Sequence, residues 1–441
     1  MTKAEEIKNN PKVIRAWSMY DWANSVYSLV ITSTIFPIYY SAVTSNEESD
    51  IVYFLGREFK NTALYSYVLS FSFLIIALVS PILSGIADYS GAKKSFMKFF
   101  CWLGGLSCVS LYFFTADTLW IGILGFVLAT IGFSGSLVFY NAFLPEIATP
   151  DRQDRVSARG FALGYIGSSL LLIFNLIMIQ QPAWFGISES SFAPRFSFLL
   201  VGVWWIGFAS YSFYHLPSNV YNRKVKGSVL LNGYKELLKV VQEIKHQKAL
   251  LIFLVSFFFY NMGVQTVMYV AALFGDKELE LESGQLILTI LIIQFVAIGG
   301  AYLFSYLSSK FGNVKALLLA LIVWTIVCFA AYFIYHANEF YMLAFTVGMV
   351  MGGVQSLSRS TYSKLLPNTM DHSSYFSFYD VCDKFGTVLG TASYGLIEEL
   401  TGSMRNSVVT LMSFFIAGLI LLVVLLRNLK KQNNLRLQPQ T

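Results

Sequence analysis

Charged side chains fall inside two apolar stretches in the last quarter of the chain. They are Arg359, with Gln355 on the same helical stripe, in the stretch 340–365, and Asp380, Asp383 and Lys384 in the stretch 374–397. An unpaired charge costs about 2.5–3.5 kcal/mol at the centre of a transmembrane helix, so we expect these two cations and two anions to pair away from lipid. Arg359 and Asp380 lie at similar depth, which predicts contact between them.

The types of these residues indicate transport chemistry. An arginine side chain is fork-shaped and can hold a carboxylate, while a partly buried aspartate can take up a proton. An Arg359–Asp380 pair that opens on substrate binding would couple the movement of a solute to that of a proton or another cation. A permanent ion-pair network between the two helices is the alternative interpretation.

The segment YDWANSVY, residues 20–27, places polar side chains at the head of the first apolar stretch. Asp21, Asn24 and Ser28 fall on one helical stripe, as expected of residues that line a central cavity. Asp21 would also suit a helix N-cap, where a carboxylate accepts hydrogen bonds from free backbone N–H groups. Both interpretations stay open, and capping at Asp21 can coexist with cavity lining below it.

Two further pairs of polar residues lie in apolar stretches. Asn261 and Gln265 are one helical turn apart on one face, and buried amides must find partners. They either bond to a neighbouring helix or contact a substrate. Tyr140 and Asn141, at the inner end of the fourth stretch, are candidates for a substrate contact from the first half of the chain.

The elements that would position these residues are membrane-spanning helices. Of the 441 residues 56% are hydrophobic and only 13% are charged, about half the ~25% of an ordinary soluble domain. Each apolar stretch is long enough to cross a bilayer. The twelve predicted spans are 22–44, 64–87, 95–114, 119–144, 159–180, 196–216, 249–273, 286–308, 314–335, 340–365, 374–397 and 407–427.

The distribution of Lys and Arg predicts how the chain is oriented. Of the 31 such residues, 24 flank the spans on one side and 5 on the other. The positive-inside rule therefore places both termini in the cytoplasm, with the chain in the cytoplasmic (inner) membrane. This bias also accounts for the net charge of +6, so no nucleic-acid partner is needed to explain it.

The chain repeats itself at an offset of about 222 residues. YNAFLPEIATPDR (140–152) falls on YSKLLPNTMDHSS (362–374). We therefore predict an all-α polytopic membrane protein with twelve transmembrane helices in two parallel six-helix halves. The halves would be 1–216 and 249–441, joined by a cytoplasmic linker, 217–248, whose amphipathic helix lies on the inner leaflet or, alternatively, binds a partner.

The loop between the second and third spans resembles the gating loop of the major facilitator superfamily. The matching residues are Asp88, Gly91, Lys93 and Lys94, although the first glycine of the usual pattern is replaced by Ser84. The resemblance implies that Asp88 holds the N-terminal end of span 11, near residues 373–375, when the cytoplasmic side is closed. A tight turn with solvated charges is the alternative.

More specific blocks resemble the vacuole-effluxer-like branch of that superfamily. The blocks are YDWANS (20–25), YNAFLPEIA (140–148), RVSARGFALGYIG (155–167), GGVQSLSRS (352–360) and LTGSMR (400–405). Fungal members of this branch are autophagy-related vacuolar exporters of amino acids, and this chain looks like a bacterial member. The resemblance implies a secondary transporter that works by alternating access on a small, amino-acid-like solute, with proton-coupled efflux as one mode. A transporter of lipids or amphiphilic metabolites on the same fold is the alternative.

Other classes of function lack their residues. The four histidines are scattered, and neither HExxH nor GxSxG occurs, so we expect no enzyme, no catalytic residue, no metal site and no cofactor. The four cysteines fall within predicted spans and are expected to be small packing residues. The expected partners are a small-molecule substrate, a coupling proton or cation and the lipid bilayer, with no obligate protein partner. Gly160, Gly164 and Gly167 predict close helix packing.

Overall fold

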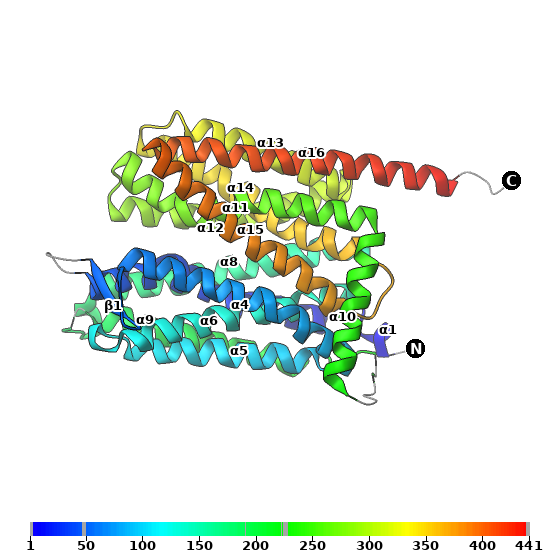
Figure 1. Cartoon of the computed structure of the whole chain (residues 1–441), viewed down its shortest axis with the longest axis horizontal. Coiled ribbons are helices and arrows are strands. Elements are labelled where there is room, and N and C mark those ends of the chain that lie inside the picture. The colour runs from blue at the N-terminus through cyan, green and yellow to red at the C-terminus, as the bar shows by residue number, and fades with distance from the viewer. Residues whose placement is uncertain (1–2, 46–49, 190, 222, 224–227, 438–441) are drawn as a thin grey trace.

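The protein folds into long helices that lie side by side in two groups, as the computed structural model shows (Figure 1). The model describes residues 3–45, 50–189, 191–221, 223 and 228–437. The first group of helices is α1 (Lys3–Ile7), α2 (Pro11–Val26), η1 (Tyr27–Ile35), α3 (Phe36–Thr44), α4 (Asn61–Ser90), α5 (Lys93–Ser110), η2 (Leu111–Phe113), η3 (Ala116–Thr118), α6 (Leu119–Asn141), α7 (Leu144–Ile147), α8 (Pro150–Gln180), η4 (Pro182–Phe185) and α9 (Phe192–His215). The linker helix and the second group are α10 (Val229–His246), α11 (Lys248–Leu279), α12 (Ser283–Phe311), α13 (Asn313–Ala331), α14 (Ala337–Leu365), α15 (His372–Thr401) and α16 (Met404–Leu437).

A short β-hairpin follows the first span and was not predicted. Strands β1 (Ile51–Phe54) and β2 (Arg57–Lys60) pair antiparallel, with Ile51 opposite Lys60. Leu55 and Gly56 form the turn with φ values of 50° and 76°. Positive φ at both central positions is typical of a two-residue hairpin loop.

The twelve predicted spans match twelve long helical segments. Eleven of these, within the described residues, are long and apolar enough to cross a membrane. The twelfth is α15, whose hydropathy is lowered by the buried Asp380 and Lys384 and the partly buried Asp383. It packs among α4, α11 and α16 as a span of the bundle does. Charge on one helix is thus compatible with membrane crossing, because that charge faces protein.

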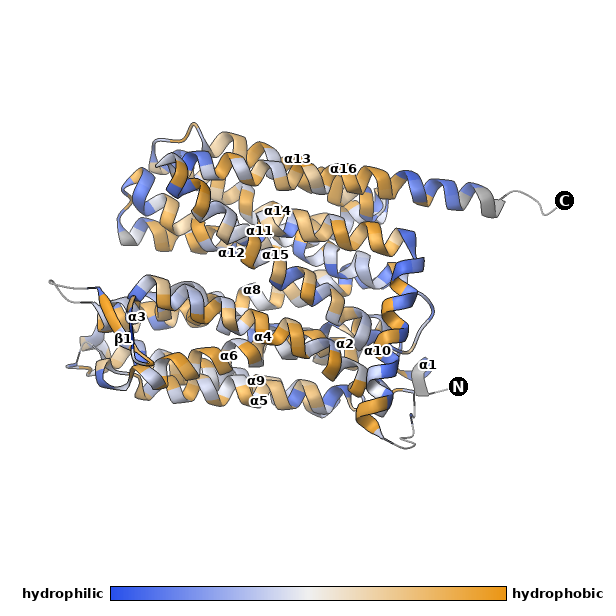
Figure 2. Cartoon of the chain, in the orientation of Figure 1, coloured by the Kyte–Doolittle hydropathy of each residue, from blue (hydrophilic) through white to orange (hydrophobic). Residues whose placement is uncertain are grey.

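Each group of helices has its own hydrophobic core. One core is built from residues 7–220 and the other largely from residues 240–425. Many large apolar residues of both groups are exposed, and hydrophobic segments run along the helices of both groups (Figure 2), as a bilayer requires. Contact between the groups is made by α8 with α12 and α14, and by α4 with α15. We use the predicted halves, 1–216 and 249–441, to name positions below.

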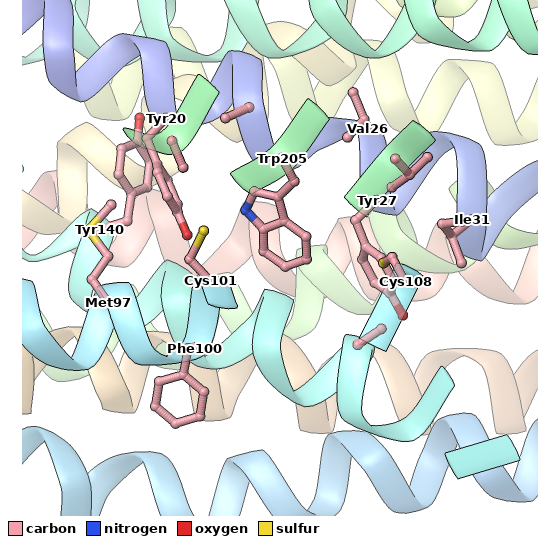
Figure 3. Packing of buried hydrophobic residues seen from close by; sticks show 14 of the residues in the cluster. Tyr20, Val26, Tyr27, Ile31, Met97, Phe100, Cys101, Cys108, Tyr140 and Trp205 are labelled. Carbon is pink, nitrogen blue, oxygen red and sulfur yellow. The ribbon is translucent and has the colours of Figure 1, made fainter. Parts of the chain in front are cut away.

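The first helix of the bundle packs deeply into the N-terminal half (Figure 3). Tyr20 and Tyr27 of α2 and η1 lie beside Cys101 and Cys108 of α5 and Trp205 of α9, all buried. The four cysteines are free thiols. Three are buried packing residues as predicted, while Cys382 is only partly buried.

Both termini and α10 lie at one end of the bundle, which we call the terminal side (Figure 1). Helix α10 crosses this end at a steep angle to the spans. Its buried face consists of Gly233, Leu237, Val240 and Ile244, which packs chiefly on α4. The linker residues 222 and 224–227 lie outside the described residues.

The predicted amphipathic helix is present as α10, and its apolar side chains divide between two faces. Ile244 packs into the protein, whereas Leu231, Tyr234 and Leu238 are exposed. The helix therefore has two apolar faces, an exposed one and a buried one. On the buried face, Gly233 lies against the backbone of Ile86 of α4, where a Cβ would collide. Attachment of the exposed face to the inner leaflet stays a prediction.

Candidate functional site

A buried ion pair joins the two halves toward the terminal side, less than two turns from the end of α14. The guanidinium Nη1 and Nη2 atoms of Arg359 on α14 each lie 3.2 Å from Oδ2 of Asp21 on α2. Arg359 is 2% and Asp21 4% exposed. The predicted Arg359–Asp380 contact is wrong. Arg359 lies where α14 meets α8 and α2, whereas Asp380 belongs to a second cluster in the C-terminal half.

The Arg359 guanidinium has a partner for every N–H group. Besides Asp21, it donates to Ser157 Oγ and Ser157 O at 2.9 Å, and to Asn141 Oδ1 at 3.4 Å. The Tyr140 hydroxyl donates to the same Asp21 oxygen at 2.7 Å. The two polar residues predicted at the end of the fourth span thus meet Arg359 and Asp21. We call Asp21, Tyr140, Asn141, Ser157 and Arg359 the central lock.

Aromatic rings enclose the central lock. The centroids of Trp17, Tyr140 and Phe161 lie 4.7, 5.4 and 4.1 Å from the guanidinium carbon of Arg359. Rings at this distance attract a cation and also exclude water. The lock is therefore held in a poorly solvated setting, where its ion pair is stronger than in water.

Asp21 does not cap a helix, so that prediction is wrong. Helix α2 begins at Pro11, and its N-cap is Asn10, whose side chain accepts from Lys12 N at 3.0 Å. Asp21 lies almost three turns inside the helix. Polar residues before the apolar run extend this helix beyond the bilayer core, which a hydropathy boundary does not detect.

The remaining polar residues of the first span lie in the same helix but have local contacts. Asn24 is 1% exposed. The Ser28 hydroxyl donates to the carbonyl of Ser25 at 3.1 Å. Ser28 belongs to the π-helical segment η1, whose wider turns alter the stripe expected from a regular α-helix. Their role in lining a cavity stays a prediction.

Glycines on α8 make room for the central lock. A Cβ at Gly160 would collide with Asp21 Oδ2 and lie 2.9 Å from Arg359 Nη2. Gly164 and Gly167 face Ser25 and Trp22 of α2 in the same way. The predicted close packing of this glycine face is confirmed, and its partner helix is α2.

Replacing Gly160 by alanine is expected to push Asp21 and Arg359 apart. Overpacking of this kind costs about 1–3 kcal/mol, so we expect a lower melting temperature in detergent and reduced transport. The control is Gly207→Ala on α9, where an added Cβ meets nothing within 4 Å. Equal behaviour of the two variants would contradict a space requirement at Gly160.

A second polar cluster lies within the C-terminal half. Lys384 Nζ lies 2.6 Å from Asp383 Oδ2 and 3.6 Å from Asp380 Oδ1. Asn261 and Gln265 of α11 donate to Asp383 Oδ1 at 2.8 and 3.1 Å. The amides therefore make helix–helix hydrogen bonds in this conformation, which was the alternative to substrate contact. We call these five residues the α15 cluster.

Gln355 forms another link between the halves. Its Oε1 accepts from the hydroxyl of Tyr165 on α8 at 2.6 Å. About two turns along α8 toward the terminal side, Ser157 Oγ donates to the carbonyl of Ser356 at 2.8 Å. Sequence reasoning did not select Ser157 or Tyr165. Both lie in the block 155–167 that carries the family resemblance and on the glycine-containing helix that was expected to pack closely, but neither feature singles them out.

The contact expected of Asp88 is present on the terminal side. Asp88 accepts from the backbone N–H groups of Ser373 and Ser374 at 3.1 and 2.7 Å, and from the Ser374 hydroxyl at 2.8 Å. These are the first residues of α15. Gly91 ends α4 with φ 67°, a conformation that favours glycine. The role of this contact as a gate stays a prediction.

The lysines of the same loop are anchors rather than solvated charges. Lys93 lies 2.5 Å from Glu146 Oε1, which also faces the ring of His372 at 3.2 Å. Lys94 donates to the carbonyl of Leu216 at 2.7 Å. The loop is thus tied both to its own half and, through Glu146, to the C-terminal half.

A second contact of similar kind was missed in the sequence. Asp154 near the start of α8 accepts from Lys364 Nζ and Asn313 Nδ2 at 2.7 Å and from Ser308 at 2.5 Å. The internal repeat contained a signal for it, because residues 84–96 align with residues 305–317. The two contacts therefore use equivalent loops, but the carboxylate belongs to the loop in one and to the helix in the other.

Asp371, next to the Asp88 contact, ties the linker to α15. Arg223 Nη2 lies 2.5 Å and Lys239 Nζ 3.2 Å from its carboxylate oxygens. Burial alone would raise the pKa of Asp371, but Arg223 and Lys239 outweigh it and hold that pKa below its ordinary value. The contribution of this pair to stability is therefore complete above the ordinary pKa and lost as pH falls through the lowered one.

The variant Asp371→Asn is expected to show this pH dependence directly. Its melting temperature should lie below that of the unmodified protein by a constant amount between about pH 5 and pH 8. The difference should disappear only at a pH below the lowered pKa of Asp371, where this carboxyl is protonated in the folded protein as well. A difference that grows as the pH falls would contradict a lowered pKa.

The fold and these contacts define the class of protein. Over 94% of this chain and 98% of the other, the structure is similar to the crystal structure of FucP, a major facilitator superfamily transporter in the outward conformation, with a TM-score of 0.69 and 13% identity. At that identity the likeness shows the fold alone: a twelve-helix, multi-pass membrane protein of the major facilitator type.

Sequence comparison gives the family. The model of the vacuole effluxer Atg22-like family matches residues 9–434. The MFS-type transporter YxiO of Bacillus subtilis is 33% identical over 418 residues, covering 94% of this chain and 95% of that one. Autophagy-related protein 22-1 of Penicillium rubens is 24% identical over 85% of this chain and 77% of that one. The chain belongs to the vacuole effluxer Atg22-like family, a family of transporters within the major facilitator superfamily.

Proposed function

We propose that this protein moves a small, amino-acid-like solute across the cell membrane by alternating access, coupled to proton movement, with both termini in the cytoplasm. The direction we propose is efflux, as the description of the family, vacuole effluxer, suggests. The observation that carries the proposal is the central lock, in which one half of the protein holds a carboxylate of the other in a buried, aromatic-lined position.

The geometry of the central lock favours replacement of Asp21 by a substrate carboxylate. Asp21 offers a single oxygen, Oδ2, to both terminal nitrogens of Arg359. Arginine binds a carboxylate best when two oxygens face two N–H groups. A substrate carboxylate that uses both oxygens would replace Asp21 at Arg359, and this exchange would release the two halves from one another.

The terminal side supports the same cycle. The contacts of Asp88 and Asp154 both join the two halves. The hydrogen bonds of each contact can break together when the halves separate. Together with the central lock they hold the terminal side closed in this conformation. Opening would require all three to separate, which suits rocking of two rigid halves about a central site.

Uptake by proteoliposomes tests the proposal. Purified protein is reconstituted, and accumulation of a labelled amino-acid mixture is measured with a proton gradient imposed in either direction and with empty vesicles as the control. We expect uptake that exceeds that of empty vesicles and changes with the gradient. Uptake equal to that of empty vesicles, from protein shown to be folded and inserted, would overturn the amino-acid assignment.

The alternative substrate class is a lipid or amphiphile. The C-terminal half contains an apolar cavity of about 50 Å³ lined by side chains of α11, α12, α13, α14 and α16. That cavity lies within one half, whereas a lipid pathway needs an apolar opening between the halves. We therefore favour the polar solute. The same vesicles loaded with labelled lipid would decide between them.

A further inference from the structure

The α15 cluster carries one more negative than positive charge. Asp380, Asp383 and Lys384 are all largely buried, and two carboxylates face one ammonium group. The central lock, by contrast, is neutral, with one guanidinium and one carboxylate. A net buried charge inside a membrane is costly. Uptake of one proton would make the α15 cluster neutral.

The two carboxylates of the cluster differ in their hydrogen bonds. Asp383 receives Lys384 on one oxygen and the amides of Asn261 and Gln265 on the other. Asp380 is 6% exposed, and its Oδ2 atom is buried without a hydrogen-bond partner among the residues that the structure describes. Its other oxygen lies 3.6 Å from Lys384, beyond hydrogen-bond distance. Asp380 is thus the carboxylate with a vacant, buried oxygen.

The neighbouring elements bring few charges to this position. Helix α4 of the N-terminal half contributes the ring of Phe73, whose centroid lies 5.5 Å from Lys384 Nζ. Tyr269 of α11 lies within electrostatic range of Lys384 and Asp383. The charged groups that α4 and α10 bring to α15, Asp88 and Glu243, contact its terminal end at residues 373–375.

The cluster also borders the interface between the halves. Phe73 belongs to α4, and α4 packs on α15 across that interface. A rocking motion that separates α4 from α15 would uncover Lys384 and its neighbours first. Water could then reach the cluster from one side of the membrane and, after the opposite motion, from the other.

We propose that Asp380 is the residue that binds and releases the coupling proton. This inference rests on the proposed transport function and names the site of its coupling. The Asp380 carboxylate takes a proton from water on one side, becomes a neutral carboxylic acid, and returns the proton to water on the other side. Lys384 remains paired with Asp383 throughout.

A metal cation fits this cluster poorly. Metal ions such as sodium or calcium need several oxygen ligands, and Ca²⁺ takes about 6–8 of them. Asp383 is already occupied by three nitrogen donors, one of which is the Lys384 ammonium group. A proton needs one oxygen atom, and Asp380 Oδ2 supplies it.

A chemical probe tests protonation without knowledge of the substrate. Dicyclohexylcarbodiimide reacts with protonated carboxyl groups in apolar surroundings, and mass spectrometry locates the adduct. In the intact protein we expect modification at Asp380 that increases as the pH is lowered, and little at Asp383. Modification at Asp383 but not Asp380, or pH-independent labelling, would overturn the proposal.

Transport assays distinguish proton coupling from movement of the solute itself. In proteoliposomes, Asp380→Asn is expected to keep solute exchange within about twofold while proton-driven accumulation falls about tenfold or more. The matched control is Glu398→Gln, which removes a charge from the outer part of the same helix, where Glu398 pairs with Lys277. Proton-driven accumulation that survives in Asp380→Asn would overturn the proposal. Labelling at Asp380 without any amino-acid transport would instead overturn the proposed substrate and support the proton site.

Discussion

Arg359→Ala is expected to abolish transport and to lower stability together. The change leaves Asp21 as a buried carboxylate without its cation, and breaking a buried pair in this way costs about 3–5 kcal/mol. The measurements are the melting temperature of the purified variant and solute uptake by proteoliposomes. We expect uptake at the level of empty vesicles even at temperatures where the variant is folded.

A double substitution distinguishes substrate binding from stability at this position. In Arg359→Ala/Asp21→Asn the unpaired charge is removed, so most of the lost stability should return. Transport should not return, because the carboxylate-binding fork is still absent. Arg359→Lys keeps the charge without the fork and is expected to fold but to bind solute weakly. Full transport by the double variant would show that Arg359 only fastens the halves.

Asp88→Asn is expected to open the terminal side. In the closed conformation Asp88 accepts three hydrogen bonds from Ser373 and Ser374 at the beginning of α15. Hydrogen bonds to a charged group contribute about 1.5–3 kcal/mol, and a carboxylate at a helix N-terminus adds about 0.3–1 kcal/mol. Losing the charge should therefore shift the closed-to-open equilibrium by about tenfold or more.

Distances between spin labels measure this opening. Labels at Lys98→Cys and Lys315→Cys would report on opposite halves from exposed positions at the terminal ends of α5 and α13. Asp88→Asn should increase the population with the longer distance. An unchanged distance distribution would contradict a gating role and favour a structural turn.

Asp154→Asn serves as the companion variant. Its partners are Lys364, Asn313 and Ser308, so it removes an ion pair as well as hydrogen bonds. If the two contacts act as one gate, the free-energy shift toward the open conformation in the double variant should not exceed the sum of the shifts in the two single variants. A larger effect would measure their coupling.

Several features of the site followed from local patterns. The contact between Asp88 and the first residues of α15 was expected from the loop sequence and its resemblance to a family pattern. Burial of Asn261, Asp380 and Lys384 followed from polar residues inside apolar stretches. The close approach of Gly160 to another helix followed from glycines spaced along one face. Each of these depends on residues within a few turns of one helix or loop.

The partners of the charged residues did not follow from such patterns. Arg359 was expected to meet Asp380, 21 residues away, and instead meets Asp21, 338 residues away. A helical stripe shows which way a side chain faces but not which helix lies opposite. The Asp154 contact was missed for the same reason, since Ser308, Asn313 and Lys364 come from three different segments of the other half.

The sequence by itself determined the membrane class, the twelve spans, their duplication and the family. These properties are local, because a bilayer requires about 20 apolar residues for each crossing whatever the neighbouring helices are. Only the tertiary structure decided that Arg359 and the charged residues of α15 belong to two separate groups, the central lock between the halves and the α15 cluster within one half. The physical reason is that a buried charge is stabilised by whichever counter-charge the packing of distant helices brings within about 4 Å, and that packing is a property of the whole fold.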